Sequence, residues 1–100
     1  MSTWTIQPQK ETGTYMFSGR VYVTAAIAET LSPAEIYQML NAVRQRVAEN
    51  NGADYLFVFT NQDEECIFII DQLNREMKSS ATREWVAQND IVTILYASEH

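Results

Sequence analysis

The chain has 100 residues, 46% of them hydrophobic, and a formal net charge of -6. One domain with one core is therefore expected, and the 7 scattered Lys and Arg residues are too few for a surface that binds nucleic-acid phosphates. No apolar run approaches the about 18 residues that a membrane span needs, and the single cysteine excludes an internal disulfide and fits a reducing cytoplasm.

Residues 1–14 are polar and mixed, and they predict a loosely attached arm that can include one edge strand. A single domain is expected to follow over residues 15–100. It begins with a predicted strand over residues 15–24, whose apolar residues alternate with other side chains: Tyr15, Phe17, Val21 and Val23. Gly19 within this strand indicates a bulge or a close approach of two backbones.

A long amphipathic helix is predicted from about residue 33 to about residue 50. Ser32 and Glu35 have the spacing of a capping box, and Pro33 occupies the first helical position, where its missing amide has no helical partner. Asn51 and Gly52 tolerate the left-handed conformation that ends a helix. The residues at helical spacing form one apolar stripe: Ile36, Met39, Leu40, Val43 and Val47.

Two β-rich runs, residues 54–60 and 66–70, flank the polar residues 61–64 and predict a hairpin. Both runs are apolar on both faces, which predicts strands buried on both sides. Because one helix covers only one face of a sheet, something else must cover the second face. The candidates are residues 72–89, the N-terminal arm or another protein molecule.

Residues 72–89 are open to two interpretations. Leu73, Met77, Ala81 and Trp85 recur at the spacing of a helix, but serines and a threonine interrupt them. In the other interpretation, residues 82–87 form a strand that pairs through a turn with a final strand over residues 91–97. We favour the hairpin. The expected fold class is α+β, with one long amphipathic helix packed on an antiparallel sheet of four or five strands.

Several segments follow one another in an order that resembles a known family: Val23-Thr24, Ile27-Ala28-Glu29, the helix from Ser32, Asp54–Phe59 and the closing Val92–His100. The family is a small uncharacterised one from Gram-positive bacteria and their phages and plasmids. The resemblance covers about half of the chain, and Ala25-Ala26 replaces the family's Arg-Gly pair, while Phe57 replaces its Gln. It implies a phage or plasmid accessory protein and brings no activity, cofactor or site residue with it.

The sequence carries no catalytic, cofactor or metal-binding signature. Cys66 has no base near it in the sequence, since the single histidine is His100 at the end of the chain. The acidic run at 63–65 lacks the alternating ligands and the glycine of a calcium loop, and glycines at 13, 19 and 52 cannot form a phosphate loop. We therefore expect a protein that is not an enzyme and has no cofactor.

A protein-binding module is the expected function, and a mobile-element protein that modulates a host factor is one form of it. Aromatic residues and the acidic run are the candidate partner-binding residues: Tyr22, Trp85, Tyr96, Asp63, Glu64 and Glu65. Two alternatives stay open. The first is a homodimer through the second sheet face, and the second is a small-ligand or enzymatic domain with a pocket between helix and sheet. No nucleic acid or membrane partner is expected.

Overall fold

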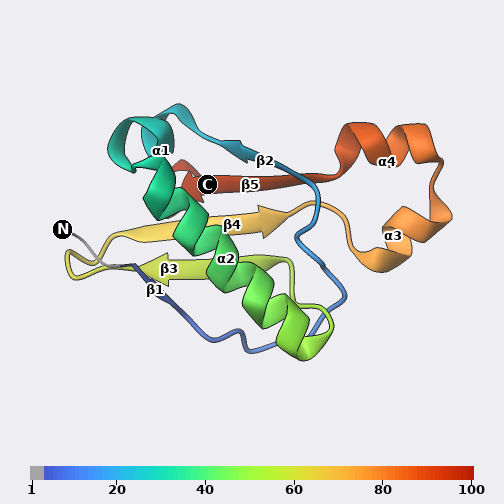
Figure 1. The fold of residues 1–100 in the computed structure, drawn as a ribbon, viewed down its shortest axis with the longest axis horizontal. Helices are drawn as coiled ribbons and strands as arrows, with labels where there is room; N and C mark the ends of the chain where they lie inside the picture. Colours follow the sequence, from blue (N-terminus) through green and yellow to red (C-terminus); the bar gives the residue numbers. More distant parts are fainter. Residues whose placement is uncertain (1–3) are drawn as a thin grey trace.

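The computed structural model describes residues 4–100 and has the predicted α+β architecture, with a long helix lying across one face of a five-stranded sheet (Figure 1). The strands are β1 (Thr5–Ile6), β2 (Arg20–Val23), β3 (Leu56–Thr60), β4 (Cys66–Asp71) and β5 (Ile91–Tyr96). The helices are α1 (Ala25–Thr30), α2 (Pro33–Asn50), α3 (Arg75–Ser80) and α4 (Arg83–Asn89), and a 3-10 turn, η1 (Ala97–Glu99), closes the chain.

The predicted long helix is confirmed as α2, with the local interactions that the sequence indicates. The Glu35 amide donates to Ser32 Oγ (3.2 Å), and the Ser32 amide donates to Glu35 Oε1 (3.0 Å). These bonds satisfy two amides that a helix start otherwise leaves without partners. At the other end, Asn51 adopts the left-handed conformation and stops the helix.

The sheet has the strand order β1-β3-β4-β5-β2. The predicted hairpin is confirmed: β3 and β4 are antiparallel, with Leu56 opposite Ile70 and Thr60 opposite Cys66. The final strand is also confirmed as β5, which lies antiparallel to β4. Only β2 runs parallel to its neighbour, β5, so the sheet is mixed and not wholly antiparallel.

The core lies between α2 and one face of the sheet. Alternate residues of the three central strands are buried there, among them Phe57, Ile67 and Ile94, beneath the buried stripe of α2. The ring of Phe17 packs edge-on against that of Phe57, with 5.1 Å between ring centroids. Within the chain, the prediction that both faces of these strands are buried holds for one face only, because the alternate residues on the far face remain partly exposed.

The predicted strand over residues 15–24 was also wrong over its first half. Tyr15 makes only an isolated bridge to Ala53, and Phe17 has a φ of 52°, which breaks an extended run. The ladder therefore begins at Arg20. A side chain at Gly19 would collide with the backbone of Asp90, so the predicted close approach of two backbones is confirmed.

The hairpin favoured for residues 82–97 was wrong in its first arm, because residues 83–89 form helix α4, and the helix α3 precedes it. Each helix has its own N-cap: the Met77 amide donates to Asn74 Oδ1 (2.8 Å), and the Trp85 amide donates to Thr82 Oγ1 (3.2 Å). The Thr82 cap outweighs the β-forming Trp85 and Val86 that follow it. Helix α1, capped by Thr24, was not predicted.

Replacing Val43 by Asp tests the packing of α2 on the sheet. Val43 is 0% exposed, so the substitution buries an unpaired carboxylate, and we expect the free energy of unfolding to fall by about 3–5 kcal/mol. Tyr37→Asp is the matched control, because Tyr37 lies on the same helix and is 62% exposed. Urea denaturation should place the control near the parent. A Val43→Asp variant as stable as the parent would contradict the buried stripe.

Candidate protein interface

The sheet face opposite α2 carries apolar side chains in register across the central strands. Val58 lies opposite Phe68, which in turn lies opposite Leu95. A parallel row consists of Leu56, Ile70 and Thr93. We call these six residues, all partly exposed, the open face: Leu56, Val58, Phe68, Ile70, Thr93 and Leu95.

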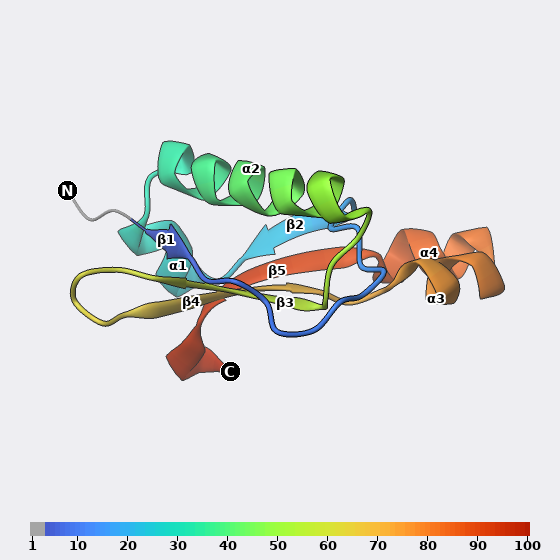
Figure 2. The ribbon, with the colours of Figure 1, turned by 90° about the horizontal axis from the view of Figure 1, so that it is seen from below.

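Two of the three expected covers do not lie over the open face. Helices α3 and α4 extend beyond the end of the sheet, and β1 pairs along the outer edge of β3 (Figures 1 and 2). The C-terminal turn does reach this side of the sheet, opposite α2 (Figure 2). There the His100 ring packs edge-on against Phe68, with 5.6 Å between ring centroids. The described chain thus leaves the open-face side chains partly exposed.

The size of the open face fits a binding surface. At the usual strand spacing and rise, the three central strands of five or six residues span about 15 Å by 20 Å, or about 300 Å². The largest contiguous apolar patch on a typical monomer covers about 300–600 Å², and such patches are often functional. Tyr22 on β2 lies opposite Thr93 on β5 and extends the open face to the sheet edge. Its side chain is 49% exposed.

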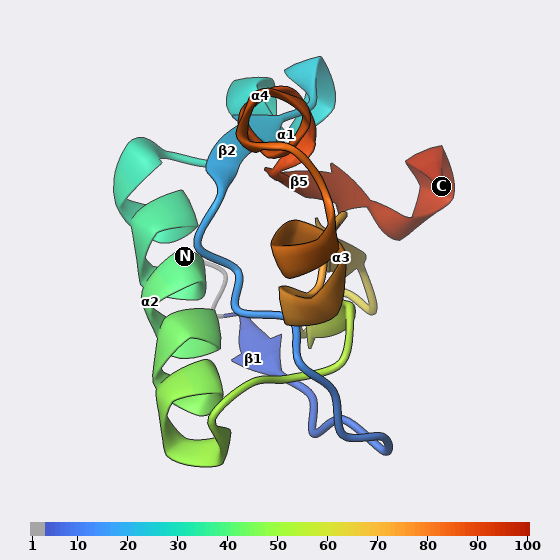
Figure 3. The same cartoon turned by 90° about the vertical axis from the view of Figure 1, so that its right-hand side faces the viewer.

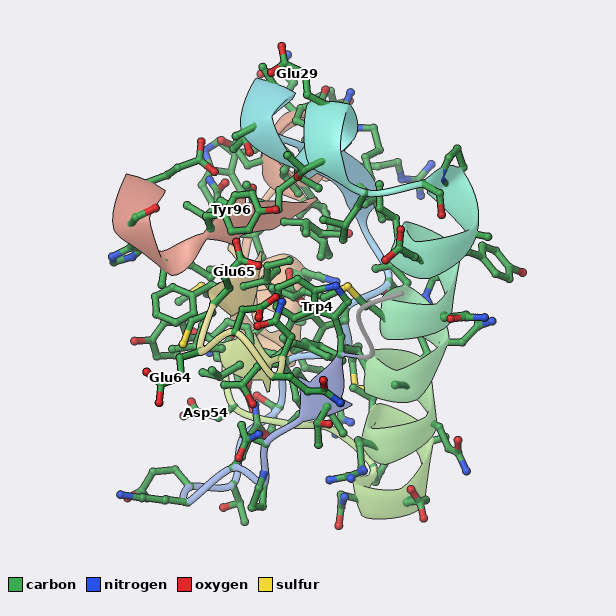
Figure 4. The ribbon with its side chains drawn as sticks, turned by 90° about the vertical axis from the view of Figure 1, so that its left-hand side faces the viewer. Trp4, Glu29, Asp54, Glu64, Glu65 and Tyr96 are labelled. Carbon is green, nitrogen blue, oxygen red and sulfur yellow. The ribbon has the colours of Figure 1, made fainter. Side chains whose placement is uncertain are left out.

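One end of the molecule is acidic. Glu29 on α1 and Glu64 and Glu65 in the β3–β4 turn lie at this end (Figure 4). The segments that meet here, residues 29–35, 61–65 and 97–100, contain no Lys or Arg. We call the exposed carboxylates of these segments the acidic end: Glu29, Asp63, Glu64, Glu65 and Glu99.

Hydrogen bonds fix the C-terminal turn at the acidic end. Glu99 Oε1 accepts from Thr24 Oγ1 (2.9 Å) and from the Tyr96 amide (2.9 Å). The Tyr96 hydroxyl shares a hydrogen bond of 2.6 Å with Thr30 Oγ1 on α1. These bonds tie the turn to α1 and so hold His100 beside the open face.

The six sequence-predicted partner-binding residues fall into three places. Tyr22 borders the open face, and Asp63, Glu64 and Glu65 form part of the acidic end. Tyr96 packs against the core at the same end, with its hydroxyl bonded to α1. Trp85 lies on α4, far from the acidic end. The open-face residues themselves were not chosen as site residues. The signal that could have found them was that the predicted strands carry apolar residues on both faces.

Trp85 belongs to a separate exposed apolar cluster. It is 44% exposed and, with Met77 and Ala81, lines a shallow hollow of about 450 Å³ between α3 and α4. Neither of these helices contributes a buried residue to the core. This cluster and the open face are therefore two different apolar surfaces.

Asp71 is a buried carboxylate at the end of β4. Its Oδ2 accepts from the Phe17 amide (2.8 Å) and its Oδ1 from the Leu73 amide (3.4 Å). Burial raises the pKa of Asp71 above its ordinary value of 3.8, and the Phe17 hydrogen bond and nearby Lys78 offset only part of that rise. The geometry points to a structural role, because the enclosed carboxyl holds Phe17 in its left-handed conformation.

Within residues 4–100, no three His, Cys, Asp or Glu side chains are grouped so that they could hold a metal ion. Among the same residues, no helix is both long enough and apolar enough to cross a membrane. Comparisons with protein-family models, with curated proteins and with solved structures give no match.

Asp71→Asn tests how ionisation of Asp71 contributes to stability. Because the folded state raises the pKa of Asp71, it binds a proton more tightly than the unfolded state does. The contribution of Asp71 to the free energy of unfolding should therefore be lost as the pH rises from about 3.8 through the raised pKa, and stay constant above it. Asn keeps an oxygen for the Phe17 amide and does not titrate.

Urea denaturation of parent and variant across this pH range measures the difference. The advantage of the parent over Asp71→Asn should shrink with rising pH. An advantage that grows with pH would mean that the fold prefers the carboxylate, contrary to the desolvation argument.

Proposed function

We propose that this protein is a non-enzymatic protein-binding module and that its main recognition surface is the open face. One observation carries the proposal: Val58, Phe68 and Leu95 form an apolar row across the three central strands on the side of the sheet that α2 does not cover. Apolar area of this kind gains free energy when a partner removes it from water.

The acidic end indicates the charge of the partner. Five exposed carboxylates lie at the acidic end, in segments without a Lys or Arg, and the C-terminal turn at this end reaches the open face. A partner with an apolar centre and basic residues along one side would complement this distribution. Such charges mainly raise the association rate and the specificity, while the apolar centre supplies most of the affinity.

The chemistry of the reactive side chains favours binding over catalysis. Cys66 lies on the open-face side opposite Thr60, and His100, the single histidine, packs on Phe68. A cysteine nucleophile needs a base within hydrogen-bond reach. In the described structure, no hydrogen bond joins the side chains of Cys66 and His100. The resemblance to a family from phages and plasmids agrees with a small accessory protein that acts by binding.

Two open-face substitutions, Val58→Lys and Leu95→Lys, test the proposal. Both side chains are partly exposed, so a lysine can extend into water without entering the core. Tyr37→Lys on the outer side of α2 is the matched control. Each immobilised protein, with its fold checked by thermal melting, is exposed to nuclease-treated host lysate, and a retained partner is then titrated.

We expect the parent and Tyr37→Lys to bind one protein stoichiometrically, and the two open-face variants to bind it at least about tenfold more weakly. Equal binding by all four proteins would contradict the assignment of the surface. Light scattering on the same samples covers the alternative of a homodimer: a parent of dimer mass with monomeric open-face variants would make a second copy the partner.

A further inference from the structure

The two edges of the sheet differ in how their main-chain groups are used. At one edge, β1 has only two residues, and the Gln7 amide donates to the Val58 carbonyl (2.8 Å). Beyond β1, the Gln9 side chain donates to the carbonyls of Asp54 (3.1 Å) and Leu56 (2.6 Å) and accepts from the Asp54 amide (3.0 Å). A side chain thus occupies the main-chain groups that an added strand would need, which closes this edge.

At the other edge, β2 is the last strand in the order and pairs only with β5 among the described residues. The amides of Arg20 and Thr24 donate inward, to the carbonyls of Asp90 (3.0 Å) and Ile94 (3.1 Å). Because successive peptide groups in a strand point in opposite directions, the amides and carbonyls of Val21 and Val23 point outward. The strand carries no proline or lysine of the kind that protects an edge.

We propose that the outer edge of β2 binds an extended segment of a partner protein as a sixth strand. The inference rests on the proposed protein-binding function and names the mode by which it operates. The outward groups of Val21 and Val23 can make four main-chain hydrogen bonds to an antiparallel segment, and main-chain bonds give such complexes affinity without a fixed sequence.

The side chains of β2 specify the chemistry of that segment. Val21 and Val23 share the face of the buried residues Val92 and Ile94, so the residues opposite them should be aliphatic. Arg20 and Tyr22 lie on the other face, with Arg20 Cζ 5.7 Å from the centre of the Tyr22 ring. A carboxylate opposite Arg20 would complement the one basic side chain of this strand.

A slender segment fits this edge better than a second copy of the chain. The hydrogen bonds between β2 and its neighbour begin at the carbonyl of Asp90, the C-cap of α4. They end at the amide of Thr24, the N-cap of α1. Both helices lie on the β2 side of the sheet, one at each end of the strand (Figures 1 and 3). In a two-fold pairing of β2 with itself, α1 of one copy would meet α4 of the other.

The probe is the peptide acetyl-Gly-Val-Thr-Val-Glu-Gly-amide. In an antiparallel arrangement, its valines lie opposite Val23 and Val21, its threonine opposite Tyr22 and its glutamate opposite Arg20. Titration into isotope-labelled protein, followed by amide chemical shifts, should give saturable shifts centred on Val21 and Val23. Methylating both valine nitrogens of the peptide should abolish the shifts, whereas methylating the threonine nitrogen, which points away from β2, should leave them.

Val23→Pro tests the same bonds from the protein side. Proline removes an outward amide and no bond to β5, so the fold should be kept while the affinity for the peptide falls about tenfold or more. Val23→Thr keeps the amide and a β-branched side chain, and should bind within about twofold of the parent. If Val23→Pro fails to fold, the two methylated peptides still decide the question.

Three results would overturn strand addition: no saturable shift, shifts centred on Phe68 and Leu95 in place of Val21 and Val23, or equal binding of the two methylated peptides. A parent dimer that Val23→Pro converts to a monomer would also overturn it, in favour of a second copy. Val58→Lys and Leu95→Lys should bind the peptide like the parent. Loss of the lysate partner in these variants, with no peptide binding in the parent, would retain the proposed function and remove only the β2 mode.

Discussion

The packing of α2 against one face of the sheet is the interaction on which the rest of the structure depends. Its buried stripe, including Met39, Val43 and Val47, covers the alternate apolar residues of the three central strands. A helix with its side chains is about 10 Å wide, and among the described residues α2 is the one helix long enough to span the sheet. The second face of the same strands also carries aliphatic and aromatic side chains, and among the described segments the C-terminal turn packs on it. Asymmetric coverage of the sheet is thus the source of the proposed binding surface.

The crossing segment of residues 15–19 connects that core to the free edge of the sheet. Phe17 is buried against Phe57, and the Asp71 carboxylate accepts from the Phe17 amide at the end of β4. The chain then passes close to Asp90 at Gly19 and enters β2 beside β5. A desolvated carboxylate costs folding free energy, and the hydrogen bonds from the Phe17 and Leu73 amides offset part of that cost. The segment thereby places Tyr22 at the border of the open face. The face and the edge are therefore adjacent parts of one surface.

Local signals in the sequence were sufficient for α2 and for the β3–β4 hairpin, because Ser32, Glu35 and the polar turn act within a few residues. The first strand was predicted too long, since alternation cannot reveal that Phe17 adopts a left-handed conformation held by Asp71, 54 residues away. The caps of α3 and α4 were present as Asn74 and Thr82, but the pattern of Thr82–Ala87 fitted a strand as well. The parallel pairing of β2 with β5 joins distant segments and has no local signal. For the candidate site, the apolar second face was inferable, whereas the choice of Trp85 and Tyr96 rested on residue type alone.

Hydroxyl-radical footprinting of the isolated protein at low concentration tests most directly whether the second face is open. Phe57, Phe59 and Phe68 lie in adjacent strands, and Phe68 alone among them is on the open face. The structure predicts that Phe68 and Leu95 are oxidised while Phe57, Phe59 and Ile94 are protected, and that a bound partner then protects Phe68 as well. Phe68 as protected as Phe57 in the dilute, partner-free protein would show that the chain covers both faces of its sheet, and the account of the interface would be wrong.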